Sequence, residues 1–386
     1  MGRGGQRRGI VTGLAVALLA TAFMQASAGE GDARAEADEG LIIGTVIQRP
    51  LDREEGRLMR DGGIDSVRFW LPWFAVEPER IEHALFPPPA DLSTAGYDWS
   101  QPDAAIREIA AEGLTPIPFL FGTPAWAARH DGRQCGESDC SSFAPASDET
   151  RYAFARFAGA AVRRYGPGGD FWQHNPGLPY RPIDVWQLWN EPNLQSFWRP
   201  YVNARGYAEL VRVAASEIHA EDADAEVVLA GLSGNRSTSK RVSTQTFLRQ
   251  FYAVPGIADS FEGIAVHPYN TRVRGVIKQI TTARTIATAR DADVDLWITE
   301  VGWASGGSRK WALVKTFSAQ ANMLRRLFTR LIRRADEWDL GGAFWYAWRD
   351  TERGEAVCGW CGAAGLRDRY GTLKPAYYEL RLLAAD

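Results

Sequence analysis

Several features are scarce in this chain of 386 residues, and each scarcity argues against a class of protein. There are only five histidines, none at the spacing of metal ligands, so the sequence predicts no metal site and no cofactor. The 44 lysines and arginines are scattered and the net charge is -3, which gives no reason to expect nucleic acid or an anionic membrane as a partner. No internal repeat, low-complexity linker or appended module is evident.

Cysteine is also scarce, with four residues in the whole chain: Cys135, Cys140, Cys358 and Cys361. Four cysteines allow three disulfide connectivities. We favour the two local pairs, Cys135 with Cys140 and Cys358 with Cys361, because each pair lies within one long loop and would staple it. A redox role for the Cys358-Gly359-Trp360-Cys361 motif and a four-cysteine zinc site are the alternatives, and export from the cell favours disulfides over both.

Export is predicted from the N-terminus. Three arginines precede an apolar run at residues 10–23, and Ala26-Ser27-Ala28 supplies small residues for cleavage. The run is shorter than the roughly 20 residues that a bilayer-spanning helix needs, so a signal peptide is favoured over a membrane anchor. We therefore expect a signal peptide at 1–28, a disordered acidic leader at 29–40 and a secreted domain at 41–386.

Apolar runs bounded by turn residues alternate with amphipathic segments eight times after the leader. The predicted strands are 41–48, 66–73, 114–122, 183–191, 225–232, 261–269, 296–302 and 341–348. The predicted helices are 51–62, 101–113, 148–165, 204–220, 246–252, 273–289, 311–334 and 375–383. Nearly continuous apolar strands that alternate with helices indicate an α/β protein with a parallel sheet covered by helices.

A single (β/α)8 barrel is the natural closed form of this pattern, and the chain length fits it. The alternative is an open doubly wound sheet, which would want a glycine-rich phosphate turn after its first strand, and Gly44-Thr45-Val46 is not one. Pro116 and Pro118 are awkward inside the third strand, because proline cannot donate to a sheet ladder. Two long loops, 123–146 and 350–372, follow the third and eighth strands and each carries one cysteine pair.

Two glutamates end buried strands in this pattern. Glu191 closes the apolar run Asp184-Val185-Trp186-Gln187-Leu188-Trp189-Asn190 and stands before Pro192, while Glu300 follows Leu296-Trp297-Ile298-Thr299. Chemistry in such barrels lies at the C-terminal ends of the strands, and the fourth and seventh strands face each other across the mouth. Two carboxyl groups about 5 to 5.5 Å apart are what a retaining glycosidase requires. Glu191 and Glu300 are therefore the predicted catalytic pair.

Aromatic residues are abundant, with 15 tryptophans. Flat rings at the barrel mouth can stack on the apolar faces of sugars, and the candidates for this are Trp70, Trp73, Trp126, Trp303 and Trp348. Trp186 and Trp189 are expected in the core instead.

The motif Trp189-Asn190-Glu191-Pro192, together with Glu300 at the end of a later strand, resembles the signature of clan A glycoside hydrolases. The motifs Val67-Arg68-Phe69, Gly122-Thr123-Pro124-Ala125-Trp126 and His267-Pro268-Tyr269 are most similar to family 39. That family includes β-xylosidases, α-iduronidases and bacterial exopolysaccharide endoglycosidases.

This resemblance implies a role for each matching residue. Glu191 would be the acid/base and Glu300 the nucleophile of a retaining hydrolase acting on an oligo- or polysaccharide. Asn190 would bind the sugar 2-hydroxyl, Arg68 and Tyr269 would flank Glu300, and His267 would lie near the acid/base. The resemblance does not decide the sugar, its linkage, the anomeric configuration, endo against exo action, or the oligomeric state.

Other interpretations remain open for the same residues. Glu300 and Arg68 could form a structural ion pair, Glu191 could cap a helix, and His267 could be a core histidine. At the level of the whole protein, the alternatives are a non-catalytic carbohydrate-binding barrel and a structural or adhesion protein of the cell exterior.

Overall fold

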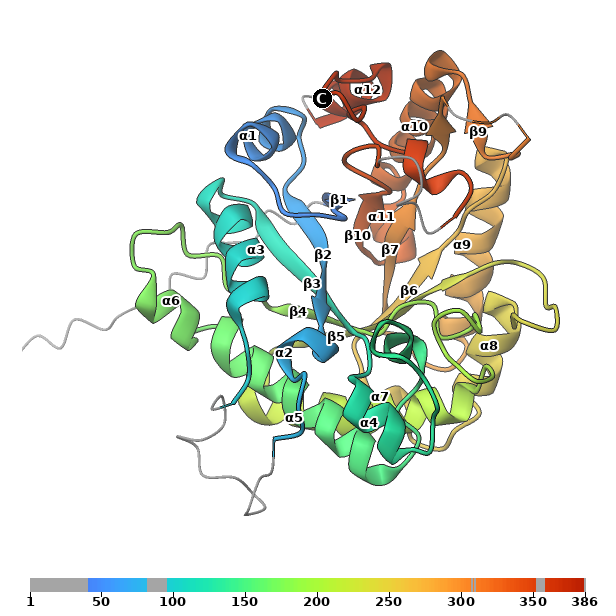
Figure 1. Ribbon diagram of the computed structural model, residues 1–386. Coiled ribbons are helices and arrows are strands. Elements are labelled where there is room, and N and C mark those ends of the chain that lie inside the picture. Colours follow the sequence, from blue (N-terminus) through green and yellow to red (C-terminus); the bar gives the residue numbers. More distant parts are fainter. Residues whose placement is uncertain (1–40, 82–95, 307, 309, 352–357, 385–386) are drawn as a thin grey trace, which may run out of the picture. The chain divides into compact units, whose positions relative to one another are not determined.

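The computed structural model describes residues 41–81, 96–306, 308, 310–351 and 358–384 (Figure 1). Eight parallel strands within these residues form a closed barrel in the order β1-β10-β7-β6-β5-β4-β3-β2. The predicted α/β barrel is thus confirmed. The predicted signal peptide and leader lie outside the described residues. Among the described residues, no helix is both long and apolar enough to cross a membrane.

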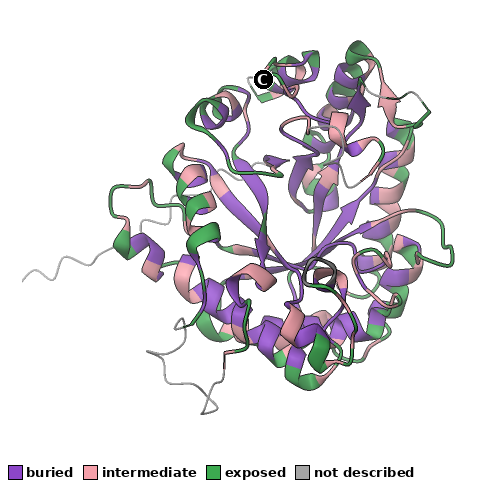
Figure 2. Ribbon diagram, viewed as in Figure 1, coloured by how far each residue is buried: buried purple, intermediate pink, exposed green. Residues whose placement is uncertain are grey.

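The barrel strands closely follow the predicted ones. They are β1 (Ile42–Val46), β2 (Ser66–Pro72), β3 (Thr115–Phe121), β4 (Val185–Leu188), β5 (Glu226–Ser233), β6 (Gly263–His267), β7 (Asp295–Val301) and β10 (Leu340–Trp345). Closure comes from β1, which pairs with β2 on one side and with β10 on the other. Most strand residues are buried, as expected for a sheet covered on both faces (Figure 2).

The helices lie around the outside of the strands (Figure 1). The main ones are α1 (Arg53–Asp61), α3 (Ser100–Ala111), α5 (Asp148–Tyr165), α7 (Ala204–Glu221), α8 (Thr244–Phe251), α9 (Val273–Thr288), α10 (Phe317–Ile332) and α12 (Pro375–Ala384). The shorter ones are α2 (Trp73–Val76), α4 (Ala125–His130), α6 (Asp170–His174) and α11 (Ala335–Trp338). Capping residues fix where several helices begin. For example, the Ser147 hydroxyl accepts from the Thr150 backbone N–H at the start of α5.

The two prolines of β3 are compatible with the sheet because of strand parity. In a parallel strand, the backbone groups of every second residue face the same neighbouring strand. Pro116 and Pro118 therefore face the same side as Leu120, whose carbonyl oxygen accepts from the backbone N–H of Trp189 after β4. Their missing N–H groups therefore face β4, and the ladder between β3 and β4 begins only at Phe119. The ladder to β2 on the other side is continuous and loses no donor to them.

One predicted helix differs clearly from the structure. The segment 311–334 was expected to be a single helix, but α10 begins only at Phe317, where the Thr316 hydroxyl caps it. The preceding residues form β9 (Val314–Lys315), which pairs with β8 (Ala304–Ser305) in a small separate sheet. A cap at Thr316 gives the helix a defined start, which hydrophobic periodicity alone could not locate.

Both local disulfides are present. Cys135 pairs with Cys140 in the loop after β3, and Cys358 pairs with Cys361 in the loop after β10. The predicted connectivity is confirmed, and no free cysteine remains among the four.

The barrel interior below the mouth is filled by its own apolar cluster. Its members from the strands are Val46, Ile117, Val228, Ala265, Trp297 and Phe344. Glycines make room for the two large rings, since a Cβ at Gly341 would lie 2.5 Å from Trp297 and one at Gly44 would lie 2.2 Å from Phe344. The mouth therefore stands on a packed and rigid floor.

A half-buried carboxyl lies at the opposite end of this floor from the mouth. Glu226, the first residue of β5, accepts a hydrogen bond of 2.6 Å from the indole N–H of Trp297. Burial and the nearby charges of Asp295 and Glu262 outweigh this bond, so the pKa of Glu226 is raised from 4.5 to about 7.

This shift predicts a pH-dependent stability. Between about pH 4.5 and 7 the unfolded chain releases the Glu226 proton while the folded chain keeps it, which lowers the free energy of unfolding by about 1.4 kcal/mol per pH unit. The substitution Glu226→Gln keeps an acceptor for Trp297 and should remove this contribution to the pH dependence of the free energy of unfolding. Urea unfolding at about pH 5 and about pH 7.5 measures that pH dependence, with the exposed Glu79→Gln as control. Equal slopes in Glu226→Gln and the parent would contradict the prediction.

Candidate active site

Glu191 reaches the barrel mouth from a strained turn. The predicted strand to Glu191 is too long, because β4 ends at Leu188. Trp189 and Glu191 then adopt φ angles of 77° and 40°, which non-glycine residues rarely adopt. The turn is held by Trp189, whose backbone N–H donates to Leu120 and whose indole N–H donates to the Phe197 carbonyl. Packing thus maintains a backbone that local sequence disfavours.

Glu300 lies within β7 and is held by two donors. Arg68 on β2 donates from Nη1 to its Oε1 at 2.7 Å, and the Tyr269 hydroxyl donates to its Oε2 at 2.8 Å. Burial alone would raise the pKa of the Glu300 carboxyl, but the positive charges at His267 and Arg68, with these hydrogen bonds, lower it. Glu300 is therefore kept ionised at neutral pH.

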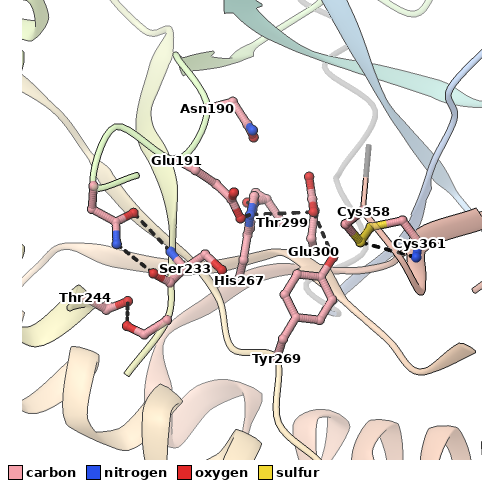
Figure 3. Close-up of polar contacts among 12 residues, drawn as sticks. Asn190, Glu191, Ser233, Thr244, His267, Tyr269, Thr299, Glu300, Cys358 and Cys361 are labelled. Atoms are coloured by element: carbon pink, nitrogen blue, oxygen red, sulfur yellow. Dashed lines mark hydrogen bonds and ion pairs between the residues drawn. A yellow bond between two sulfur atoms is a disulfide. The ribbon is translucent and has the colours of Figure 1, made fainter. Parts of the chain in front are cut away.

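Glu191 has a different environment from Glu300. Its Oε1 lies 2.8 Å from Nδ1 of the fully buried His267, whose Nε2 lies 3.0 Å from the hydroxyl of Thr299. The side chains of Glu191 and Glu300 point toward one another (Figure 3), and one carboxylate oxygen of each lies within 4.8 Å of the other. The two glutamates predicted from separate strands therefore meet at one site, with His267 between them.

Arg68 connects the Glu300 carboxylate to Asn190 and Gln187. Its guanidinium is completely buried and lies over the ring of Phe119, with 4.1 Å between Cζ and the ring centroid. Besides Glu300, it donates from Nη2 to Asn190 Oδ1 at 3.0 Å and from Nε to Gln187 Oε1 at 2.7 Å. Because the oxygen of Asn190 faces Arg68, its amide nitrogen is the end that can donate to a bound hydroxyl.

Gln187 and Thr299 belong to the site but were not predicted. The Gln187 side-chain amide donates to Thr299 Oγ1 at 3.2 Å and to the Leu229 carbonyl at 3.0 Å. The Thr299 hydroxyl accepts from Gln187 and also lies 3.0 Å from Nε2 of His267. Thr299 thereby holds the imidazole ring so that its Nδ1 faces Glu191. The sequence could have indicated Gln187, because it is a polar residue within an otherwise apolar strand.

A glycine leaves the space for this chain of bonds. A Cβ at Gly231 on β5 would lie 2.0 Å from His267 Nε2 and 2.7 Å from Thr299 Oγ1. Any side chain there would displace the histidine ring that contacts Glu191.

Two aromatic residues of the eighth-strand region also reach the site without having been predicted. Tyr346 follows β10, and burial together with the charges of Glu300 and Glu191 raises its pKa. Trp360, half-buried between Cys358 and Cys361, packs its ring against Tyr269 at 4.8 Å and against Tyr346 at 6.1 Å between centroids. Figure 3 shows this disulfide next to Tyr269 and Glu300. The predicted loop staple therefore fixes an aromatic ring at the site.

The tryptophans predicted to stack on sugars divide into two groups. Trp70 is 41% exposed and shares strand parity with Arg68, so its ring lies at the mouth, while Trp126 is half-buried and donates to the Glu77 carbonyl. Three others are buried and offer no face to a ligand, which corrects the expectation for Trp73, Trp303 and Trp348. Trp303 donates instead to the Asn270 carbonyl and packs on Trp345. Trp186 and Trp189 are buried, as predicted.

Glu191, His267 and Glu300 are also the one set of potential metal ligands in the described part of the chain, with their ligand atoms within 4.8 Å of one another. Both oxygens of Glu300 already accept hydrogen bonds, one of them from the guanidinium of Arg68. A divalent cation would stand close to that buried cation and compete for the same oxygens. The donor set therefore fits a pair of reacting carboxyl groups better than a metal centre.

Comparison with known families identifies a glycosyl hydrolase catalytic core at residues 182–355, a range that contains both glutamates. No curated protein matches the chain. The expected resemblance to glycoside hydrolases is confirmed, with the similarity to a glycosyl hydrolase catalytic core lying within the barrel.

Solved structures share the fold at low identity. A family 39 glycoside hydrolase from Bacteroides cellulosilyticus WH2 has a TM-score of 0.60 and 20% identity, with 90% of this chain and 64% of that chain covered. A monomeric beta-xylosidase from Caulobacter crescentus CB15 has a TM-score of 0.62 and 18% identity, with 90% and 68% covered. A GH5_18 protein from Bifidobacterium longum subsp. infantis has a TM-score of 0.60 and 15% identity, with 90% and 79% covered. The chain thus spans less than two thirds of the Bacteroides protein.

The bonds around His267 predict a specific effect of Thr299→Val. Valine keeps the shape but removes the hydroxyl, leaving Nε2 of a buried histidine without its partner. We expect kcat for an aryl glycoside to fall about tenfold, equivalent to about 1.4 kcal/mol, with KM little changed. Thr299→Ser should restore kcat. Equal kcat values for Thr299→Val and the parent would show that the hydroxyl does not act on His267.

The disulfide at Trp360 predicts a redox-dependent affinity. A dithiol that reduces Cys358–Cys361 to two thiols should release the Trp360 ring from Tyr269 and raise KM about two- to tenfold, the range of an aromatic contact worth about 0.5–1.5 kcal/mol. Cys358→Ser with Cys361→Ser should reproduce the rise without reductant. Cys135→Ser with Cys140→Ser is the matched control, and an equal effect there would assign the rise to loop stability in general.

Proposed function

We propose that this glycosidase cleaves O-glycosidic bonds of an oligo- or polysaccharide with retention of configuration at the anomeric carbon. The observation that carries the proposal is the separation of the two carboxylates, with an oxygen of each within 4.8 Å of the other. Retaining enzymes hold their carboxyl groups about 5 to 5.5 Å apart, whereas inverting enzymes need about 6.5 to 9.5 Å to admit a water molecule.

The environments of the two carboxyl groups support a division of roles. Glu300, which is kept ionised by Arg68 and Tyr269, is suited to attack the anomeric carbon. Glu191, bound to His267 and free of a direct guanidinium contact among the described residues, is suited to carry the proton that the leaving oxygen takes.

The reaction then proceeds in two displacements. In the first, a Glu300 oxygen forms a bond to the anomeric carbon as the glycosidic C–O bond breaks, and Glu191 gives its proton to the leaving oxygen. In the second, Glu191 takes a proton from water, the water oxygen bonds to the anomeric carbon, and Glu300 leaves as a carboxylate. Arg68 and Tyr269 stabilise Glu300 again as its charge returns.

Substrate orientation is assigned to residues next to the pair. The amide of Asn190, fixed through its oxygen by Arg68, can donate to the sugar hydroxyl beside the anomeric carbon. Trp70 at the exposed mouth and Trp360 over Tyr269 offer rings for the apolar faces of sugars.

We further propose that the protein acts outside the cell, after removal of residues 1–28, with the barrel in residues 41–386. The N-terminal sequence supports export, and two disulfides are typical of oxidising compartments. A polysaccharide too large to enter a cell is a consistent substrate.

Removing each carboxylate tests the assigned roles. Glu300→Gln should lower kcat at least about 10³-fold on every substrate, because no nucleophile remains. Glu191→Gln should lose a similar factor on substrates with poor leaving groups but much less on a dinitrophenyl glycoside, which leaves without a proton. Glu226→Gln, which replaces a half-buried carboxyl at the other end of the barrel, is the control and should keep its activity.

The stereochemical outcome tests the mechanism directly. NMR of the first product should show the anomer of the substrate, and an inverted anomer would refute retention. Full activity in the double variant Glu191→Gln with Glu300→Gln would remove the enzymatic assignment of this site and favour a carbohydrate-binding barrel.

A further inference from the structure

A cavity of about 270 Å³ lies between the segments that follow β1 and β10. It is lined by residues that follow β1 and by residues that follow β10, both at the C-terminal ends of their strands. Its polar lining includes Gln48, Arg49, Glu55, Arg349 and Arg369. The volume is below the roughly 300–1,000 Å³ of pockets for drug-sized ligands, so it fits one sugar unit rather than several.

The cavity is rich in guanidinium groups. A single oxygen of Glu55, which is 1% exposed, is shared by Arg49 at 3.0 Å, Arg349 at 3.2 Å and Arg367 at 3.4 Å. Arg367 does not line the cavity and also pairs with Glu54 at 3.3 Å. The lining arginines Arg49 and Arg349 share Glu55, and one carboxylate cannot use all the donors of two arginines, each of which carries five N–H groups. The Arg49 side chain in particular is 51% exposed and can turn toward a ligand.

The other carboxylate of the lining does not balance this charge. Asp350 is paired with the buried Lys374, with 2.7 Å between Oδ1 and Nζ, and also accepts from the Gly365 backbone N–H. The arginine side of the cavity therefore keeps a positive charge that favours an anionic group.

A donor without a partner supports the same conclusion. The indole Nε1 of Trp348, which lines the cavity, is buried and has no hydrogen-bond partner among the described residues. A buried donor without an acceptor costs stability, and a bound acceptor would recover it. Trp348 was predicted to stack its ring face on a sugar; here its indole N–H is the group that would contact the ligand, by a hydrogen bond.

One hydrogen bond connects the cavity to the reaction centre. Gln48, in the cavity wall, donates from Nε2 to the Tyr346 hydroxyl at 2.5 Å. Tyr346 in turn packs against Tyr269, with 6.3 Å between ring centroids, and the Tyr269 hydroxyl donates to Glu300. A sugar in the cavity would therefore be close to the one undergoing cleavage.

We propose that this cavity is a subsite for a carboxylate-bearing sugar, a hexuronate unit adjoining the scissile bond of an acidic polysaccharide. The planar forks of Arg49 and Arg349 match a planar carboxylate in a bidentate manner, which a neutral sugar hydroxymethyl group cannot exploit. The inference rests on the proposed glycosidase function, since it assigns a substrate class to the same mouth.

Binding of small sugars tests the subsite without knowledge of the cleaved linkage. The dissociation constants of methyl glucuronide, methyl galacturonide, methyl glucoside and methyl galactoside can be measured on the whole protein by titration NMR. At least one uronide should bind about tenfold or more tightly than its neutral counterpart, and added salt should reduce the difference. Equal binding of both uronides and their neutral counterparts would overturn the proposal.

A matched pair of arginine substitutions locates the effect. Arg49→Gln should remove most of the preference for the uronide, while Arg60→Gln, equally exposed and paired with Glu112 near α1 and α3, should keep it. An unchanged preference in Arg49→Gln would overturn the assignment to this cavity. Tighter binding of a sugar sulfate, with no preference for the uronides, would overturn the carboxylate assignment.

Activity separates this inference from the proposed function. If the parent hydrolyses an aryl glycoside but shows no uronide preference, the subsite fails and the glycosidase stands. If the uronide preference is present but no glycoside in a broad panel is hydrolysed, the proposed function fails and the cavity remains an anionic-sugar site.

Discussion

The buried guanidinium of Arg68 is the interaction on which the rest of the mouth depends. A cation without solvent must be compensated by nearby acceptors, because an unpaired buried charge costs several kcal/mol. Arg68 on β2 obtains its acceptors from β4 and β7, through Gln187, Asn190 and Glu300. Strands distant in sequence are thereby held at one relative position. The same contacts that satisfy the arginine place the two carboxylates opposite each other.

The asymmetry of the two glutamates follows from this arrangement. Glu300 receives the positive charge and a phenol, whereas Glu191 receives a histidine that is itself fixed by Thr299 and Gln187. Two identical side chains thus acquire different hydrogen-bond partners, and the partners of Glu300 lower the pKa of its carboxyl. The strained backbone at Glu191 directs its side chain toward His267, whereas a regular strand would direct it elsewhere.

The loops around the mouth differ in character from the rigid floor. The floor is a packed apolar cluster with glycines fitted against Trp297 and Phe344, and it leaves little freedom for variation. The mouth carries the disulfide-bound Trp360 on one loop and an arginine-lined cavity between the ends of β1 and β10. Substrate choice in such barrels depends on loops of this kind, while the chemistry depends on the strand ends.

The sequence by itself determined the barrel and both catalytic candidates. Alternating apolar and amphipathic segments are local patterns, and Glu191 and Glu300 stand where two such patterns break, so neither required knowledge of packing. Tertiary structure alone decided which other side chains face the site. Gln187, Thr299, Tyr346 and Trp360 join it, while Trp303 turns into the core. Strand parity, barrel register and loop packing set these directions, and they arise from contacts between residues far apart in the chain.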